Sequence, residues 1–182
     1  MNKGFTIIEL SITIFILSIA VIGIYSAFSI MLILTTDTAD RLVASYLAQE
    51  GAEIIRNIRD SNWIANSSTG NSWDYGLSIC QNGLSCQVDY STASSYVLSW
   101  NGGDAGGDYL GLDPNGFYSY RGGEQTKFRR RITIDCLPYG DCGSSHIMKV
   151  AVEVFWDEKP NILRPEGGTG VIEVQDVLYN WY

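Results

Sequence analysis

Residues 5–34 read FTIIELSITIFILSIAVIGIYSAFSIMLIL, and this stretch decides the architecture of the chain. Its only charged residue is Glu9. Because about 20 consecutive apolar residues already cross a bilayer as a helix, the stretch can span a membrane with residues to spare. It is longer than the apolar part of a secretory signal peptide, and no small-residue cleavage site follows it. The sequence therefore predicts a membrane-spanning helix rather than a buried core helix or a cleaved signal.

Glu9 is out of place in this apolar segment, because an ionisable group within a spanning helix costs a few kcal/mol and is a functional candidate by default. No Lys or Arg lies between residues 5 and 34 to neutralise it. We therefore expect its cationic partner on a neighbouring chain. Lys3 and the terminal amine are the only positive groups before the apolar segment, so the C-terminal part of the chain is expected outside the cytoplasm.

The sequence GFTIIEL at residues 4–10 resembles the cleavage motif of type IV prepilins and type II secretion pseudopilins. The resemblance implies that residues 1–4 are a leader, that prepilin peptidase cuts between Gly4 and Phe5, and that the new amine of Phe5 is methylated. It also implies that Glu9 pairs with the Phe5 amine of an adjacent subunit during assembly. The implied partners are other pilin or pseudopilin subunits, the peptidase and the cytoplasmic membrane.

The same resemblance implies a single-pass cytoplasmic membrane protein with an extracytoplasmic C-terminal domain. After assembly, the subunit would lie in an extracellular or periplasmic filament. A type IV pilus and a type II secretion pseudopilus use the same N-terminus, so both remain open.

Residues 35–60 continue the helix in amphipathic form. They contain no proline, and their apolar side chains recur at helical spacing with polar residues between them. Gly23 and Gly51 are the weak points of this helix. The apolar positions of the stripe are Leu42, Val43, Tyr46, Leu47, Ile54, Ile55 and Ile58. We therefore expect one helix from about Phe5 to about Asp60.

The helix sequence favours a minor subunit. Residues 16–23 and 47–60 resemble the corresponding parts of minor pilins and minor pseudopilins. Major pilins often carry a proline partway along this helix, whereas the first proline here is Pro114. Glu50 and Glu53 form a carboxylate pair on one helix, but with arginine neighbours they indicate a solvated face rather than a catalytic pair.

Residues 61–182 predict a globular, β-rich head, with Ser61–Tyr75 as a loop. Four segments have strand patterns: Tyr96–Trp100, Phe128–Ile134, Met148–Trp156 and Val171–Tyr179. In the second, Phe128, Arg130, Ile132 and Ile134 share one face. We expect an antiparallel sheet that packs on the amphipathic half of the helix, which is an α+β fold. The order of the last three strands also resembles minor pilin heads.

The four cysteines form two sequence pairs, Cys80/Cys86 and Cys136/Cys142, each with turn residues between its members. In an oxidising compartment this pattern predicts two local disulfides. A four-cysteine zinc site is the alternative, but structural zinc ligands usually lie two to four residues apart.

The segment NGGDAGGDYLGLDPNG at residues 101–116 contains Asp104, Asp108 and Asp113. Their carboxylates are candidate calcium ligands, and some pseudopilins bind calcium in such loops. The spacing does not follow the EF-hand pattern, so a solvated flexible loop is the favoured interpretation. No other cofactor is expected.

The composition argues against nucleic acid as a principal partner, and the absence of catalytic motifs argues against an enzyme. The net charge is -8, and the basic run Arg129–Arg131 divides between two faces of a strand. No nucleotide-binding, hydrolase or metalloprotease motif is present. The sequence therefore predicts a structural filament subunit without enzymatic activity. The alternative is a filament-tip adhesin or DNA-binding pilin whose aromatic-rich head binds a ligand.

Overall fold

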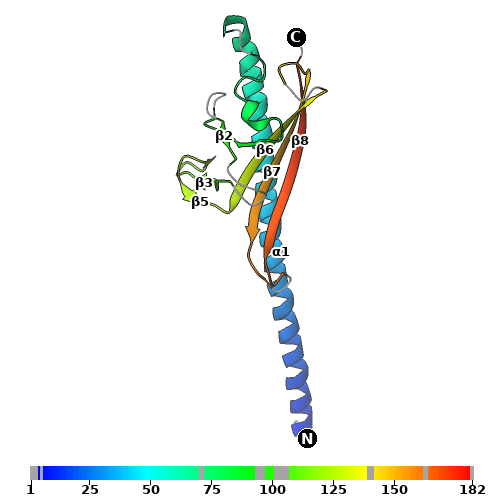
Figure 1. Ribbon diagram of the computed structural model, residues 1–182. Coiled ribbons are helices and arrows are strands. Elements are labelled where there is room, and N and C mark those ends of the chain that lie inside the picture. Colours follow the sequence, from blue (N-terminus) through cyan, green and yellow to red (C-terminus); the bar gives the residue numbers. More distant parts are fainter. Residues whose placement is uncertain are drawn as a thin grey trace. The chain divides into compact units, whose positions relative to one another are not determined.

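The computed structural model describes residues 4, 6–69, 72–92, 97–100, 107–138, 142–161 and 164–180, without the side chains of 66–69. The chain divides into two compact units, Met1–Asp40 and Arg41–Tyr182. One helix, α1, runs from Ile7 to Thr69 and contributes to both units (Figure 1). The described part of the first unit is helical from Ile7 onward, and the second unit contains the rest of α1 and the β-strands.

Helix α1 ends at Thr69, so the prediction of an end near Asp60 and of a loop from Ser61 was wrong. Two properties of the sequence explain the extension. No Gly or Pro interrupts the chain between Gly51 and Gly70, and the buried stripe continues from Ile58 to Asn62. The Asn62 amide donates to the backbone oxygens of Trp73 (3.1 Å) and Tyr75 (2.8 Å), so it fixes the turn that follows the helix.

The main sheet of the described residues has five antiparallel strands in the order β2-β1-β6-β7-β8. Their bounds are β1 Ser85–Gln87, β2 Leu98–Ser99, β6 Phe128–Leu137, β7 Ile147–Glu158 and β8 Gly168–Tyr179. A short 3-10 helix, η1, spans Ser78–Cys80. The three predicted C-terminal strands are confirmed as β6, β7 and β8, each longer than predicted, and the antiparallel α+β class is confirmed.

The core lies between one face of this sheet and the second half of α1. Ile132, Val152 and Val174 are cross-strand neighbours in the middle of the sheet. The helix contributes apolar residues at helical spacing, but the predicted stripe is only partly correct. Leu47, Ile55 and Ile58 are buried, and Val43 and Ile54 are partly buried. Leu42 and Tyr46 are exposed, at 56% and 64%. The buried helix residues are Ala44, Leu47, Ala48, Ala52, Ile55 and Ile58. The predicted face of β6 is also correct, because Phe128, Arg130, Ile132 and Ile134 are all buried.

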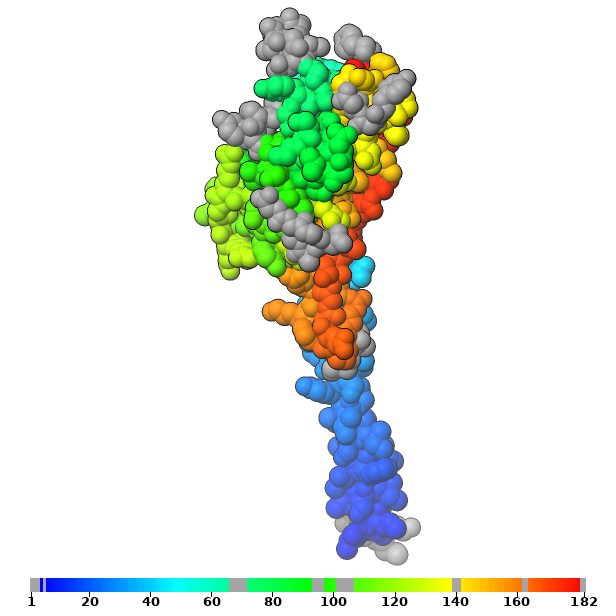
Figure 2. Space-filling view, viewed as in Figure 1, coloured from blue at the N-terminus to red at the C-terminus, as the bar shows by residue number. Residues whose placement is uncertain are grey.

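A second, three-stranded sheet was not predicted. It consists of β3 (Gly111–Leu112), β4 (Tyr118–Ser119) and β5 (Glu124–Gln125), in the order β4-β3-β5. Figure 2 shows these residues in yellow-green, as a lobe at one side of the head. Its position is fixed by Leu110, which is fully buried and whose N–H donates to the backbone oxygen of Phe128 (2.9 Å). The expected solvated loop at 101–116 is therefore wrong from Leu110 to Leu112.

Candidate functional site

The N-terminal segment begins α1 with a capped first turn. Thr6 directly precedes the helix, and its backbone oxygen accepts the N–H of Leu10 (3.2 Å). Its Oγ1 accepts the N–H of Glu9 (3.3 Å), which makes Thr6 the N-cap residue. Glu9 lies in the first helical turn. Gly4 is exposed, and Phe5 lies outside the described residues. Glu9 thus lies in the first turn of α1 and is the fifth residue after the predicted cut.

The first unit presents apolar side chains on all sides. Its large hydrophobic residues are mostly more than half exposed, from Ile7 at 86% to Leu34 at 52%. The described part of the helix is long and apolar enough to cross a membrane, with a mean hydropathy of 2.6 in its most apolar window. Such a surface is unfavourable in water and indicates burial in lipid or against other helices.

The hydroxyl groups of this helix add little polarity to its surface. Every Ser and Thr between Ser11 and Thr38 donates its hydroxyl to a backbone oxygen three or four residues earlier. In an apolar surrounding, a hydroxyl without a partner is costly, and this internal bonding removes the cost. Glu9 is the only charged side chain of α1 before Asp37.

Comparison with known families agrees with this geometry. Residues 1–25 match the family model of the prokaryotic N-terminal methylation motif. The chain has a type IV pilin-like N-terminus. The resemblance indicated by Gly4, Phe5 and Glu9 is therefore confirmed for the N-terminal motif, which is typical of type IV pilins and pseudopilins. No curated protein and no solved structure matches the chain.

The head is held to the second half of α1 by Arg130, a fully buried residue of β6. Its Nη1 donates to the backbone oxygen of Leu47 (2.8 Å) and to the Glu50 carboxylate (3.0 Å). Its Nη2 donates to the backbone oxygen of Val88. One guanidinium therefore joins the helix, the sheet and the segment after β1, as its planar array of donors permits.

The other two arginines of the basic run also have carboxylate partners, on the opposite face of the sheet. Arg129 pairs with Asp157 (2.9 Å) and Arg131 with Glu153 (2.7 Å). Each guanidinium also lies over an aromatic ring, that of Tyr109 for Arg129 and those of Phe155 and Trp100 for Arg131. The predicted division of the run between two faces is correct.

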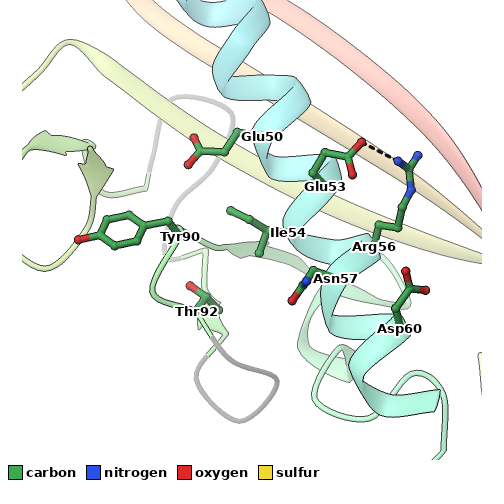
Figure 3. A pocket seen from close by; sticks show the side chains of 8 residues that line it. All are labelled: Glu50, Glu53, Ile54, Arg56, Asn57, Asp60, Tyr90 and Thr92. Carbon is green, nitrogen blue, oxygen red and sulfur yellow. Dashed lines mark hydrogen bonds and ion pairs between the residues drawn. The ribbon is translucent and has the colours of Figure 1, made fainter. Parts of the chain in front are cut away.

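A surface hollow of about 480 Å³ lies beside α1 in the head (Figure 3). Its lining includes the predicted carboxylate pair, but each carboxylate has a cationic partner: Glu50 pairs with Arg130 and Glu53 with Arg56 (2.6 Å). Arg56 also pairs with Asp176 of β8 (2.7 Å), and this contact raises the pKa of its guanidinium. These ion pairs favour a structural over a catalytic role for the two glutamates. The contact between Glu50 and a buried arginine was not predicted.

Asp89 is a buried carboxylate that the sequence did not single out. Burial acts to raise its pKa, but the hydrogen bonds that it accepts outweigh burial and lower the pKa. The donors come from two segments: Ser91 and Thr92 in the adjacent turn, and Ser119 and Tyr120 at the end of β4. Asp89 therefore ties the small sheet to the main sheet. Beside it, burial raises the pKa of Tyr120 to about 12.

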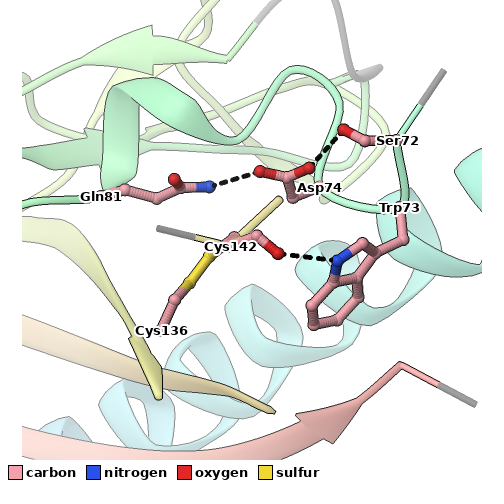
Figure 4. Close-up of a disulfide and its surroundings, with 6 residues drawn as sticks. All are labelled: Ser72, Trp73, Asp74, Gln81, Cys136 and Cys142. Atoms are coloured by element: carbon pink, nitrogen blue, oxygen red, sulfur yellow. Dashed lines mark hydrogen bonds between the residues drawn. A yellow bond between two sulfur atoms is a disulfide. The ribbon is translucent and has the colours of Figure 1, made fainter. Parts of the chain in front are cut away.

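The four cysteines form two local disulfides, Cys80–Cys86 and Cys136–Cys142, with Cα–Cα distances of 4.9 and 5.0 Å. No cysteine is left free for a metal. Cys80 and Cys86 connect η1 to β1. Cys142 accepts a hydrogen bond from the Trp73 indole through its backbone oxygen (2.9 Å; Figure 4). The second disulfide thus fixes the end of β6 against the segment that follows α1.

Two of the three calcium candidates, Asp108 and Asp113, lie within the described residues. Asp104 lies outside them. Asp113 accepts the backbone N–H groups of Phe117 (2.9 Å) and Asn115 (2.8 Å), and the bond from Phe117 is the main cause that lowers its pKa. Asp108 contributes its backbone oxygen as the acceptor for Gln87 (3.4 Å). In the part of the chain that the structure describes, no group of three or more His, Cys, Asp or Glu residues could hold a metal.

Proposed function

We propose that the chain is a structural subunit of a type IV pilus or type II secretion-like filament. In this proposal, prepilin peptidase removes residues 1–4, Phe5 becomes the methylated N-terminus, and Glu9 pairs with the Phe5 amine of a neighbouring subunit. The match of residues 1–25 to the N-terminal methylation motif is the observation that carries it. The isolated carboxylate in the first turn of a helix whose first half is apolar and largely exposed supports the same interpretation.

The helix would insert in the cytoplasmic membrane with the head on the outer side, before the subunit moves into an extracellular or periplasmic filament. A minor role is favoured because α1 contains no proline over its full length. Two disulfides in the head agree with an oxidising compartment.

Processing is tested by expressing the full-length precursor with and without a prepilin peptidase and measuring the intact mass. The expected product lacks residues 1–4 and carries one added methyl group. Gly4→Leu should block the cut, whereas Gly23→Leu, a matched change within the helix, should be processed normally. An unprocessed wild-type chain, or a cut at another bond, would disprove the processing step.

Assembly is tested with Glu9→Gln, which keeps the size of the side chain and removes its charge. The variant should insert in the membrane and be cut, but its amount in sheared filaments should fall at least about ten-fold, because the amine of the neighbour loses its anionic partner. Glu53→Gln is the control on the head. Wild-type incorporation of Glu9→Gln would contradict the proposed pairing.

Ligand binding by the head remains the second prediction from the sequence. The basic run does not favour nucleic acid as the ligand, because each of Arg129, Arg130 and Arg131 is paired with a carboxylate. Binding of glycans by filaments with and without this subunit would test the adhesin alternative.

A further inference from the structure

We propose that Thr6 is a positioning residue for precursor cleavage: its hydroxyl starts α1 at Ile7 and so keeps the bond after Gly4 outside the helix. This inference rests on the proposed processing by prepilin peptidase. In that reaction, water adds across the Gly4–Phe5 amide, the C–N bond breaks, and a carboxylate on Gly4 and an ammonium group on Phe5 are formed.

Two hydrogen bonds identify Thr6 as the N-cap. Its backbone oxygen accepts the first intrahelical bond, from Leu10. Its Oγ1 accepts the N–H of Glu9, one of the donors at the start of a helix that have no partner within it. Thr6 and Glu9 also have the spacing of a capping box. The capping bond is most valuable in an apolar surrounding, where water cannot replace it.

The position of the cap matters because a helix occupies the backbone groups that a peptidase must reach. If α1 began earlier, the carbonyl of Gly4 would accept the N–H of Ile8, and its carbon would be shielded by the first turn. In the structure Gly4 lies outside the helix and is exposed, and no atom lies within 4 Å of the position of a Cβ there. A helix that starts at Ile7 thus leaves Gly4 open to the enzyme.

The sequence indicates which residue would cap the helix if the Thr6 hydroxyl were lost. Upstream of Thr6, the next residue with a good capping side chain is Asn2. A helix capped by Asn2 would include residues 3–6, and the bond to be cut would lie in its first turn. Val at position 6 keeps the branched shape of Thr but removes the acceptor, so it favours this longer helix.

The experiment compares cleavage of full-length, detergent-solubilised precursors by purified prepilin peptidase. Thr6→Val should lower kcat/KM about five-fold, in proportion to the typical effect of a lost cap, and Thr6→Ser should restore the wild-type value. Thr13→Val is the matched control, because the Thr13 hydroxyl bonds only to the oxygens of Glu9 and Leu10 among the described contacts. It should be cut at the wild-type rate.

The possible failures are distinguishable. If wild type is cut and Thr6→Val is cut equally fast, or if Thr6→Ser is as slow as Thr6→Val, the positioning role is overturned and the proposed function stands. If the wild-type precursor is not cut between Gly4 and Phe5, the proposed function fails and this inference fails with it. Extraction with alkaline carbonate before solubilisation verifies that every variant was inserted in the membrane, so a slow cut cannot come from a chain that was never inserted.

Discussion

Gly51 of α1 lies directly against the buried side chain of Arg130: a Cβ on residue 51 would stand 2.9 Å from Arg130 Cδ. The same Cβ would stand 2.9 Å from Cγ1 of Val152 on β7. Gly51 weakens the helix by its flexibility, yet it allows the helix backbone to approach the sheet closely enough for Arg130 to reach Leu47 and Glu50. The glycine and the arginine are therefore parts of one contact.

We expect Gly51→Ala to destabilise the head by about 1–3 kcal/mol, because the added methyl group overpacks a site between two fixed side chains. This loss should exceed the gain of about 1 kcal/mol that Ala usually brings to a helix. Thermal unfolding of the full chain in detergent measures the effect. Gly23→Ala is the control, since no atom lies within 4 Å of its Cβ position. A higher melting temperature for Gly51→Ala would show that the contact is looser than described.

Arg130→Met should lower the free energy of unfolding by about 2–4 kcal/mol, because it leaves the backbone oxygen of Val88 without its donor inside the head. Glu50→Gln should cost less, since the Glu50 side chain is 34% exposed and water can solvate it. Urea unfolding measures both values. An equal loss in the two variants would mean that the ion pair, rather than the backbone contacts, accounts for the effect of Arg130.

The stability of the head should fall at acid pH in part through Asp89. Its pKa in the folded chain is lower than the ordinary value of 3.8. Its contribution is therefore fully present above pH 3.8 and is lost as the pH falls through the folded pKa. Asp89→Asn should be less stable at neutral pH and should show a weaker loss below pH 3.8. A melting-temperature series from pH 2 to 7 tests this; parallel curves for the variant and wild type would contradict it.

Replacing Cys136 and Cys142 by Ser should destabilise the head by about 2–3 kcal/mol, the entropy expected for closing so short a loop. The Trp73 indole should also become more mobile, because its acceptor is the backbone oxygen of Cys142. Unfolding followed by tryptophan fluorescence measures both effects. The same substitutions at Cys80 and Cys86 provide the comparison. Reduced wild-type protein should be as unstable as a variant in which all four cysteines are replaced by Ser. Unchanged stability after reduction would rule out this role of the disulfides.

The long elements of the fold could be predicted because their patterns extend over many residues. Alternation along Phe128–Ile134 correctly placed Arg130 on the buried face, although an arginine would ordinarily be expected in solvent. The partners of Arg130 could not be predicted, since Leu47 and Val88 contribute backbone oxygens that have no sequence signature.

The short elements left no usable pattern. A strand of two residues, such as β3, is too brief for alternation to be recognised, and its position depends on Leu110 being buried against Phe128. The N-cap does have a signal in the sequence, because Thr6 and Glu9 have the spacing of a capping box.

The pairing of the basic run has a consequence for polyanions. Protein–DNA affinity depends largely on the release of counterions when free cationic groups neutralise phosphates. Each of Arg129, Arg130 and Arg131 already has a carboxylate of this chain as its counterion. A phosphate backbone would have to displace these tethered carboxylates, which cannot diffuse away, and the usual gain in entropy would be missing. For a polyanion, the surface formed by these three consecutive arginines is therefore nearly uncharged.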